Sequence, residues 1–285
     1  MTTSRRRLQR RSITLVGIAC LTGALTACGG NADGSGSSGG SYESNLVSSG
    51  SLTFCADISS PPLTFYDQDQ KAIGAEVELG DAIAAKMDLK PVWKNVAFAG
   101  IIPAVQAHQC DAIMSQLYIK PDREKVVDFV PYMFAGNTVL VKAGNPDGIT
   151  GVDDLCGRKV AVETGTTAAD VLAQQSATCQ KNGDDPINIA QFNRDTEAQQ
   201  QLKIGLVDGY GTTVETAGYA MTNQQGTFDT VGEPFGKIQT GIATTKDDGQ
   251  LHDAIGKAFA EVRADGDYDA ILKKWELTGD ALPAK

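Results

Sequence analysis

Histidine is scarce in this sequence, with His108 and His252 the two in a chain of 285 residues. The cysteines include no Cys-x-x-Cys pair, so the ligand spacing typical of a structural zinc site is missing. The sequence also lacks a P-loop motif. These absences argue against a metal site and a nucleotide site, and we expect no metal and no cofactor.

Basic residues are outnumbered by acidic ones, 25 to 35, which gives a formal net charge of −10. Five arginines lie within residues 1–12, where there is no acid, so the chain beyond residue 27 carries a charge of −15. Nucleic-acid binding depends on clustered positive charge that neutralises phosphates. The charge balance therefore excludes nucleic acid as an expected partner.

Long apolar runs are limited to the N-terminal end. Residues 13–27 are small or apolar and uncharged, and this run is too short for a comfortable membrane span. It ends in Leu-Thr-Ala before Cys28, the processing signal of a bacterial lipoprotein. This predicts a lipoprotein signal peptide at 1–27 and lipidation of Cys28. An ordinary secretory cleavage site is the alternative, and the arginine pairs allow either the general or the twin-arginine export route.

Glycine and serine dominate the segment that follows Cys28, and such a composition is typical of a flexible tether. We expect this tether to cover residues 28–49, with the ordered part starting near residue 50. A lipid, a tether and a domain together predict an exported protein held on the outer face of the cytoplasmic membrane.

Four cysteines remain beyond the signal and lipid positions, and an even number in an exported chain indicates two disulfides. They fall in pairs by region. This favours the bridges Cys55–Cys110 and Cys156–Cys179 over the crossed alternatives.

Strand-like and helix-like segments alternate along the chain, which predicts α/β architecture with largely parallel sheets. The expected strands are 52–57, 91–96, 110–115, 138–144, 159–163, 187–192 and 240–246. Leu79, Ile83 and Met87 mark one face of a helix over 74–88, and further helices are expected between the strands and over 250–277.

Two of these strands end in polar residues, one in each half of the chain. Ser115 is the last residue of the strand at 110–115 and Gln116 follows it, and Thr166 and Thr167 follow the strand at 159–163. Ligands of open α/β sheets bind beyond the carboxyl ends of the strands. These two strand ends are therefore the candidate site.

The chain resembles the polar amino-acid-binding proteins of ABC importers, family 3 of the bacterial solute-binding proteins. The resemblance covers roughly residues 50–280. It is carried, in the family's order, by "ADISSPPLTF", "GAEVELGDAIAAKM", "FAGIIPAVQAHQCDAIMSQLYIKPDREKVVDFVPYM", "DLCGRKVAVETGTT", "VDGYGTTVETAGY" and "AFAEVRADGDYDAILKKW". The paired cysteines also recur in Gram-positive members.

The resemblance implies a two-lobed clamp of the type II periplasmic-binding-protein class, each lobe a mostly parallel sheet flanked by helices. Lobe 1 would hold residues 50–135 and 242–282, and lobe 2 would hold 136–241. The implied function is capture of a small carboxylate-bearing solute, most simply an amino acid or derivative. The solute would then pass to an ABC permease and its ATPase. We expect a monomer.

The resemblance also implies the ligand contacts. Arg123 would hold the solute carboxylate, because a guanidinium pairs bidentately with a carboxylate; a surface arginine paired with a nearby acid is the alternative. The other implied ligand residues are Asp57, Phe98, Ser115, Gln116, Tyr118, Glu163, Thr166, Thr167 and Thr213. Each has a structural alternative, such as a core side chain for Phe98 or helix capping for the threonines.

Thr213 departs from the family pattern, since many members carry an aspartate there that neutralises the solute's α-ammonium. A buried ammonium without a partner would cost several kcal/mol. Either Glu215 or Glu163 takes this role, or the solute has no primary α-ammonium, or its positive charge lies elsewhere. We expect a cationic or zwitterionic solute.

Two other functions fit the same motifs. The fold also hosts dehydratases, and Asp57, Glu163 and Glu215 are the candidate acids for such chemistry. A surface lipoprotein that senses a solute without transporting it is the other alternative. The implied lipid anchor favours binding over catalysis, and we expect no enzymatic activity.

Overall fold

The computed structural model describes residues 41–283. The predicted signal peptide, Cys28 and the tether up to residue 40 lie outside the described residues. The strands are β1 (Ser51–Ala56), β2 (Phe65–Tyr66), β3 (Ala72–Ile73), β4 (Lys90–Asn95), β5 (Ala112–Ile113), β6 (Val127–Lys142), β7 (Lys159–Glu163), β8 (Asn188–Phe192), β9 (Gly209–Thr213) and β10 (Phe228–Thr245). The α-helices are α1 (Ala75–Lys86), α2 (Ile101–Gln106), α3 (Pro121–Glu124), α4 (Thr167–Asn182), α5 (Asp195–Lys203), α6 (Val214–Asn223), α7 (Gly249–Ala264) and α8 (Asp267–Lys274).

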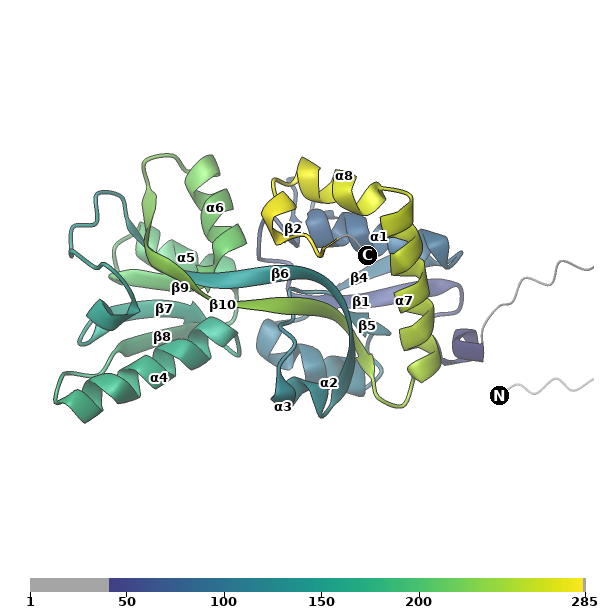
Figure 1. The fold of residues 1–285 in the computed structure, drawn as a ribbon, viewed down its shortest axis with the longest axis horizontal. Helices are drawn as coiled ribbons and strands as arrows, with labels where there is room; N and C mark the ends of the chain where they lie inside the picture. Colours follow the sequence, from purple (N-terminus) through teal and green to yellow (C-terminus); the bar gives the residue numbers. More distant parts are fainter. Residues whose placement is uncertain (1–40, 284–285) are drawn as a thin grey trace, which may run out of the picture. The chain divides into compact units, whose positions relative to one another are not determined.

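One sheet runs through the described chain in the order β4-β1-β5-β10-β6-β9-β7-β8. Strand β1 pairs in parallel with β4 and β5, and β7 pairs in parallel with β8 and β9. The long strands β6 and β10 pair antiparallel to each other and connect the two parallel parts (Figure 1). The predicted parallel pairing therefore holds within each part, and an antiparallel pair joins the parts.

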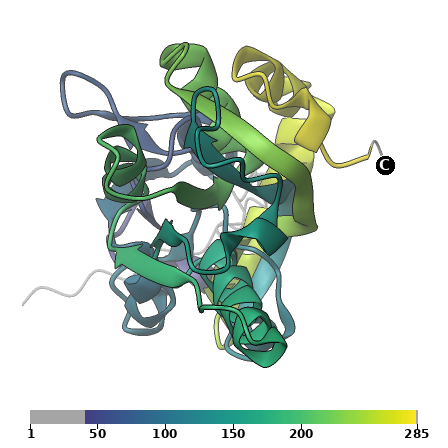
Figure 2. The same cartoon turned by 90° about the vertical axis from the view of Figure 1, so that its left-hand side faces the viewer.

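Buried apolar residues form two separate groups, which we call the first and the second lobe. The first-lobe cores draw on residues 52–133 and 242–277, and the second-lobe cores on residues 139–228. Side-chain alternation on the strands explains why helices cover both faces of the second lobe. Val160 and Val162 pack in one core with α4, whereas Ala161 packs in the other with α5 and α6. Figure 2 shows the molecule with the second lobe facing the viewer.

Some elements differ from the sequence-based expectation. The segment expected as a strand at 138–144 is the second half of β6, because the chain stays extended from Val127 through the crossing between lobes. Helix α5 ends at Lys203, so Leu206 leaves the helical face and is 55% exposed. The adjacent Gly205 has φ 75°, a conformation that terminates the helix.

The ordered part of the chain begins before the predicted residue 50. Ser41–Asn45 forms a 3-10 helix, and the side chains of Tyr42 and Leu46 pack against the first-lobe core. The N–H of Val47 donates to the Asp111 carboxylate at 2.7 Å. The apolar side chains of Tyr42, Leu46 and Val47 interrupt the glycine- and serine-rich composition, and this was the available signal that the ordered part begins before residue 50.

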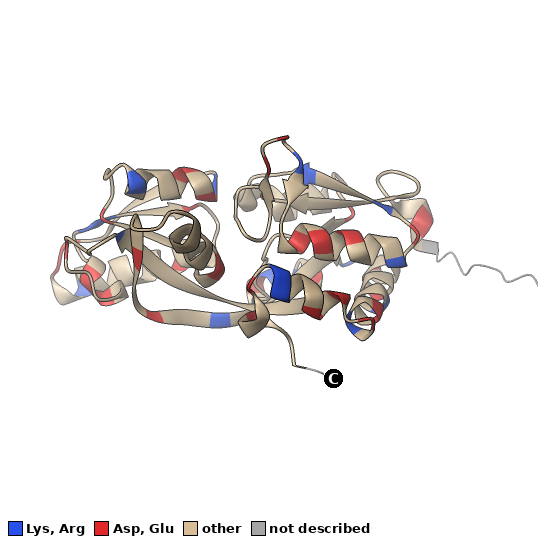
Figure 3. Cartoon of the chain, turned by 90° about the horizontal axis from the view of Figure 1, so that it is seen from above, with Lys and Arg blue, Asp and Glu red and all other residues tan. Residues whose placement is uncertain are grey.

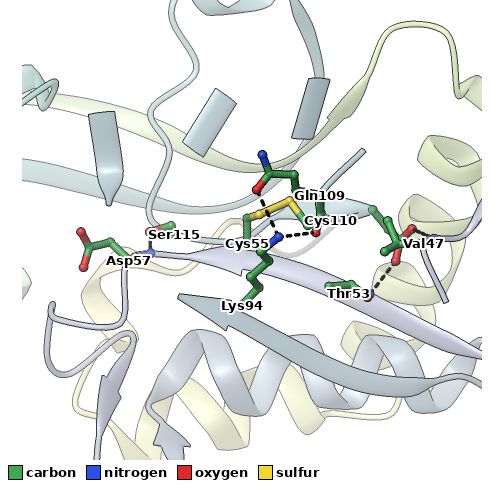
Figure 4. Close-up of a disulfide and its surroundings, with 9 residues drawn as sticks. Val47, Thr53, Cys55, Asp57, Lys94, Gln109, Cys110 and Ser115 are labelled. Atoms are coloured by element: carbon green, nitrogen blue, oxygen red, sulfur yellow. Dashed lines mark hydrogen bonds between the residues drawn. A yellow bond between two sulfur atoms is a disulfide. The ribbon is translucent and has the colours of Figure 1, made fainter. Parts of the chain in front are cut away.

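Both predicted disulfides are present. Cys55–Cys110 joins the end of β1 to the chain that enters β5, and Cys156–Cys179 joins the β7 approach to α4. Figure 4 shows the first bridge, with Asp57 and Ser115 beyond it along the same two segments. This disulfide therefore holds together two of the chain segments that reach the candidate site.

Most charged side chains of the described residues are exposed or half-buried. Figure 3 shows acidic positions on many helices, with lysine and arginine at scattered positions between them. Between residues 41 and 283, no helix combines the length and apolar character needed to cross a bilayer.

Candidate binding cleft

A cleft lies between the lobes and brings together most of the predicted site residues. The predicted residues in its lining are Phe98, Ser115, Gln116, Tyr118, Arg123, Glu163, Thr166, Thr167 and Thr213. Asp57 does not line the cleft. Other lining residues were not predicted from sequence. Among them, Glu76, Asn137 and Asp195 each have a buried polar side-chain atom without a hydrogen-bond partner.

Arg123 lies in the short helix α3, which begins with Pro121, and its side chain turns back into the cleft. It is 7% exposed and donates from Nη1 to the Tyr118 carbonyl at 3.1 Å and from Nη2 to the Gly165 carbonyl at 3.2 Å. Its guanidinium lies 5.6 Å from the centre of the Phe98 ring. None of the ion pairs among the described residues involves Arg123. The arrangement leaves a buried cation available to an anion.

Thr166 and Thr167 form the turn from β7 into α4. Thr166 is the N-cap: its Oγ1 accepts from the Ala169 N–H at 3.2 Å and donates to the Glu163 carbonyl at 2.8 Å. The buried hydroxyl of Thr167 has no partner. The capping alternative is therefore correct for Thr166, while Thr167 presents a free hydroxyl at the positive end of a 16-residue helix, where anions are stabilised.

The polar residues after β5 differ in their burial and in the hydrogen bonds that they form with other protein groups. Ser115 Oγ accepts from the Asp57 N–H at 2.9 Å, and the Tyr118 hydroxyl donates to the Gly136 carbonyl at 3.1 Å. Tyr118 is 3% exposed, so its side chain is buried and not solvated. Gln116 has φ 44°, a left-handed conformation that is rare without glycine and often marks a functional site.

Gln116 links two buried glutamates, Glu76 in the cleft lining and Glu215, which is outside the lining but next to Thr216, a lining residue. Its backbone N–H donates to Glu76 Oε1 at 2.6 Å and its Nε2 donates to Glu215 Oε2 at 2.8 Å. Glu76 also accepts from the Tyr132 hydroxyl. The second oxygens, Glu76 Oε2 and Glu215 Oε1, are buried without partners. Burial raises the pKa of each of these carboxyl groups to about 7.

Glu76 was missed by sequence reasoning, although a signal was present. It precedes Leu79 by three residues and Ile83 by seven, so it lies on the apolar face of α1. An acid on a buried helical face needs a polar partner or a function. Thr213, by contrast, lies where it was expected in the cleft wall, and its Oγ1 caps α6 by accepting from the Thr216 N–H at 3.3 Å.

A second acidic group is formed by Asp57, Glu163 and Asp195, which influence one another electrostatically. Glu163 Oε1 and Asp195 Oδ2 are buried without partners. Burial, followed by the nearby charge of Asp57, raises the pKa of Glu163 well above its usual range. Burial likewise raises the pKa of Asp195, whose other oxygen accepts from Tyr210. Asp195 follows the end of β8, so the strand-end rule that identified Thr166 could have identified it too.

Asp57 differs from its two neighbours because both its oxygens have protein partners. Oδ2 accepts from the Phe98 N–H at 3.1 Å, and Oδ1 accepts from Nη1 of Arg194 at 3.1 Å. This explains why Asp57 is absent from the cleft lining. The described residues contain no group of three or more histidine, cysteine, aspartate or glutamate side chains arranged to hold a metal ion.

The sequence matches a large group of known proteins. The model of the bacterial extracellular solute-binding proteins, family 3, matches residues 52–278. The arginine-binding protein ArgT of Corynebacterium glutamicum is 30% identical over 81% of this chain and 76% of its own. The L-cystine-binding protein TcyJ of Escherichia coli is 29% identical over 75% and 78%.

Solved structures agree with this family. An ancestral arginine-binding protein bound to arginine superposes with a TM-score of 0.73 at 35% identity, over 79% of this chain and 98% of that one. An ancestral amino-acid-binding protein, AncCDT-1, described as a precursor of cyclohexadienyl dehydratase, superposes with a TM-score of 0.72 at 31% identity, over 79% and 95%. The chain is a member of the bacterial extracellular solute-binding proteins, family 3.

Proposed function

We propose that this protein is the solute-binding component of an ABC importer and that it captures an amino acid whose side chain carries N–H donors. It would be exported, anchored through lipidated Cys28, monomeric, and would deliver the solute to a membrane permease driven by an ATPase. Relatives named as amino-acid-binding proteins of ABC transporters support the transport role.

The observation that carries the proposal is a set of unsatisfied buried groups in and beside one cleft. Among the described residues, Arg123 has no anionic partner, and four buried carboxylate oxygens have no donor. Buried polar groups without partners are costly, by about 1–3 kcal/mol each. An amino acid would supply a carboxylate to Arg123 and Thr167, and nitrogen donors to the carboxylates. The unpartnered oxygens belong to Glu76, Glu163, Asp195 and Glu215.

The two acidic groups suggest two nitrogen sites. Glu76 and Glu215 would hold the α-ammonium, which answers the absence of an aspartate at Thr213. Glu163 and Asp195, which belong to the other acidic group, would receive a guanidinium, amine, imidazole or amide from the side chain. A solute that touches both lobes stabilises the closed arrangement, which is how such clamps capture ligands.

A thermal-shift and calorimetric panel tests this function, because a ligand of the folded state raises its apparent stability. Arginine, lysine, histidine and glutamine should include the stabilising solutes, whereas argininamide and putrescine, which lack a carboxylate, should not stabilise. Stabilisation by aspartate and glutamate alone would contradict the proposal. Prephenate should neither bind tightly nor be turned over, and turnover would support the dehydratase alternative instead.

The affinity for arginine should rise with pH. Glu76 and Glu215 keep protons up to about pH 7 in the solute-free protein, and a cationic nitrogen requires their ionised forms. We expect arginine to bind at least tenfold more tightly at about pH 8 than at about pH 5.5, with protons released on binding. Titrations in buffers of different ionisation heat would measure this release.

Stability without solute should change in the opposite direction. Both carboxyl groups have folded pKa values above their unfolded value of about 4.3, so the folded state binds more protons between about pH 4.5 and pH 7. Their contribution to the free energy of unfolding therefore decreases as pH rises through that window. Glu76→Gln should reduce both the pH dependence of the arginine affinity and the pH dependence of the free energy of unfolding. An arginine affinity that is flat or falls with pH would contradict the assignment of Glu76 and Glu215 to a cationic nitrogen.

A further inference from the structure

Arg194 of the second lobe binds an acid of the first lobe. It is the N-cap residue of α5 in the second lobe, and its Nη1 contacts Asp57 Oδ1 at 3.1 Å and Asn95 Oδ1 at 2.7 Å in the first lobe. The Asp57 side chain is 1% exposed and the Arg194 side chain 27% exposed. The ion pair therefore has a fully buried anion and a partly solvated cation.

The surrounding contacts hold this bridge in place. The side-chain amide oxygen of Asn95, Oδ1, also accepts from the Ile58 N–H at 3.2 Å, which orients the Asn95 side chain toward Arg194. The N–H of Asp195 donates to Ser59 Oγ at 3.1 Å, so the first residues of α5 are fixed against the first lobe. Arg194 is therefore a positioned cation rather than a freely moving surface side chain.

The bridge changes the charge at one end of the cleft. Asp57 lies beside Glu163 and Asp195, and its charge raises the pKa of both neighbours. Those two acids each keep one oxygen without a partner, whereas Asp57 keeps none. The protein thus supplies its own guanidinium to the acidic group that we propose receives the solute side chain.

We propose that Arg194 sets side-chain specificity by neutralising Asp57, and so reduces the preference of the cleft for cationic side chains over neutral side chains of the same shape. This inference rests on the proposed function. Arginine and citrulline form the matched probe pair, since citrulline replaces the guanidinium with a neutral urea of nearly the same shape. Their affinity ratio isolates the charge effect, because the loss of a contact between lobes weakens both solutes alike.

The experiment measures dissociation constants of arginine and citrulline for the wild-type protein, Arg194→Gln, Asp57→Asn and the double variant. Arg194→Gln should shift the ratio toward arginine by about tenfold, and Asp57→Asn should shift it toward citrulline by a similar factor. The double variant should return the ratio to near the wild-type value, because the charge then changes by zero.

Lys120→Gln is the matched control. Among the ion pairs of the described residues, Lys120 forms the other one between lobes, with Asp170 at 2.7 Å, and it lies outside the cleft lining. It should lower both affinities slightly and leave their ratio unchanged. An unchanged ratio in Arg194→Gln, with both affinities reduced, would overturn the inference and show that Arg194 only holds the lobes together. If none of the proteins bound arginine or citrulline while other amino acids bound, the inference would fail but the proposed carboxylate site would stand.

Discussion

Arg123→Ala should weaken amino-acid binding by about a thousandfold, the largest effect expected of any single substitution in the cleft. The solute carboxylate would enter a water-poor site and lose the buried guanidinium that faces it, and such truncations cost about 2–5 kcal/mol. Part of this loss comes from the Tyr118 and Gly165 carbonyls, which would lose their shared donor. Calorimetry with the best solute of the panel measures the effect.

Two variants separate charge from geometry. Arg123→Lys keeps the charge but loses the planar fork, so it should recover only part of the affinity. Arg158→Ala removes a half-exposed arginine of the second lobe, paired with Asp147, and should leave binding unchanged. Unaltered affinity in Arg123→Ala, with the protein still folded, would mean that Arg123 is a structural residue and that the carboxylate binds elsewhere.

Gly165→Ala should reduce affinity by about a hundredfold by preventing full closure. Gly165 lies in the turn before α4, and a Cβ added there would lie 3.1 Å from Ala99 Cα in the opposite lobe. The lobes would have to separate slightly to relieve this contact. That separation would also move the Gly165 carbonyl away from Arg123.

Gly183→Ala is a close control for the backbone effect. Gly165 has φ 81° and Gly183 has φ 89°, so alanine is strained to a similar degree at both positions, by about 1–2 kcal/mol. A Cβ on Gly183, however, meets no atom within 4 Å. Both variants should lower the free energy of unfolding, but only Gly165→Ala should lower affinity. Equal affinity losses would show that closure does not depend on the contact with Ala99.

Much of the cleft was predictable because strand ends are local features of the sequence. The polar residues after β5 and the threonines after β7 lie at the carboxyl ends of parallel strands, where the alternation of strands and helices already placed a site. Arg123 depended on the family resemblance, since a lone arginine in a short helix has no local pattern that distinguishes a ligand from a surface ion pair.

The ion pair between Asp57 and Arg194 could not be predicted from the sequence. Its partner Arg194 is 137 positions away, and the contact exists only because the second lobe meets the first. The same holds for the link from Gln116 to Glu215 across 99 positions. Pairings of this kind depend on how the two lobes meet, which no periodicity or spacing reveals. The buried face of α1, in contrast, did contain the signal for Glu76.

The irregular pairing between β6 and β10 determines how easily the clamp bends. Their register shifts between Val231 and Phe235 and again between Phe235 and Ile238, where the two strands cross between the lobes. Regular ladder bonds there are already interrupted, so a change of curvature would break few further backbone bonds. The bending stiffness at the crossing is thus low, and the angle between the lobes should respond mainly to the side chains that meet across the cleft. A single substitution at Arg194 or Gln116 could then alter the resting angle without altering either lobe.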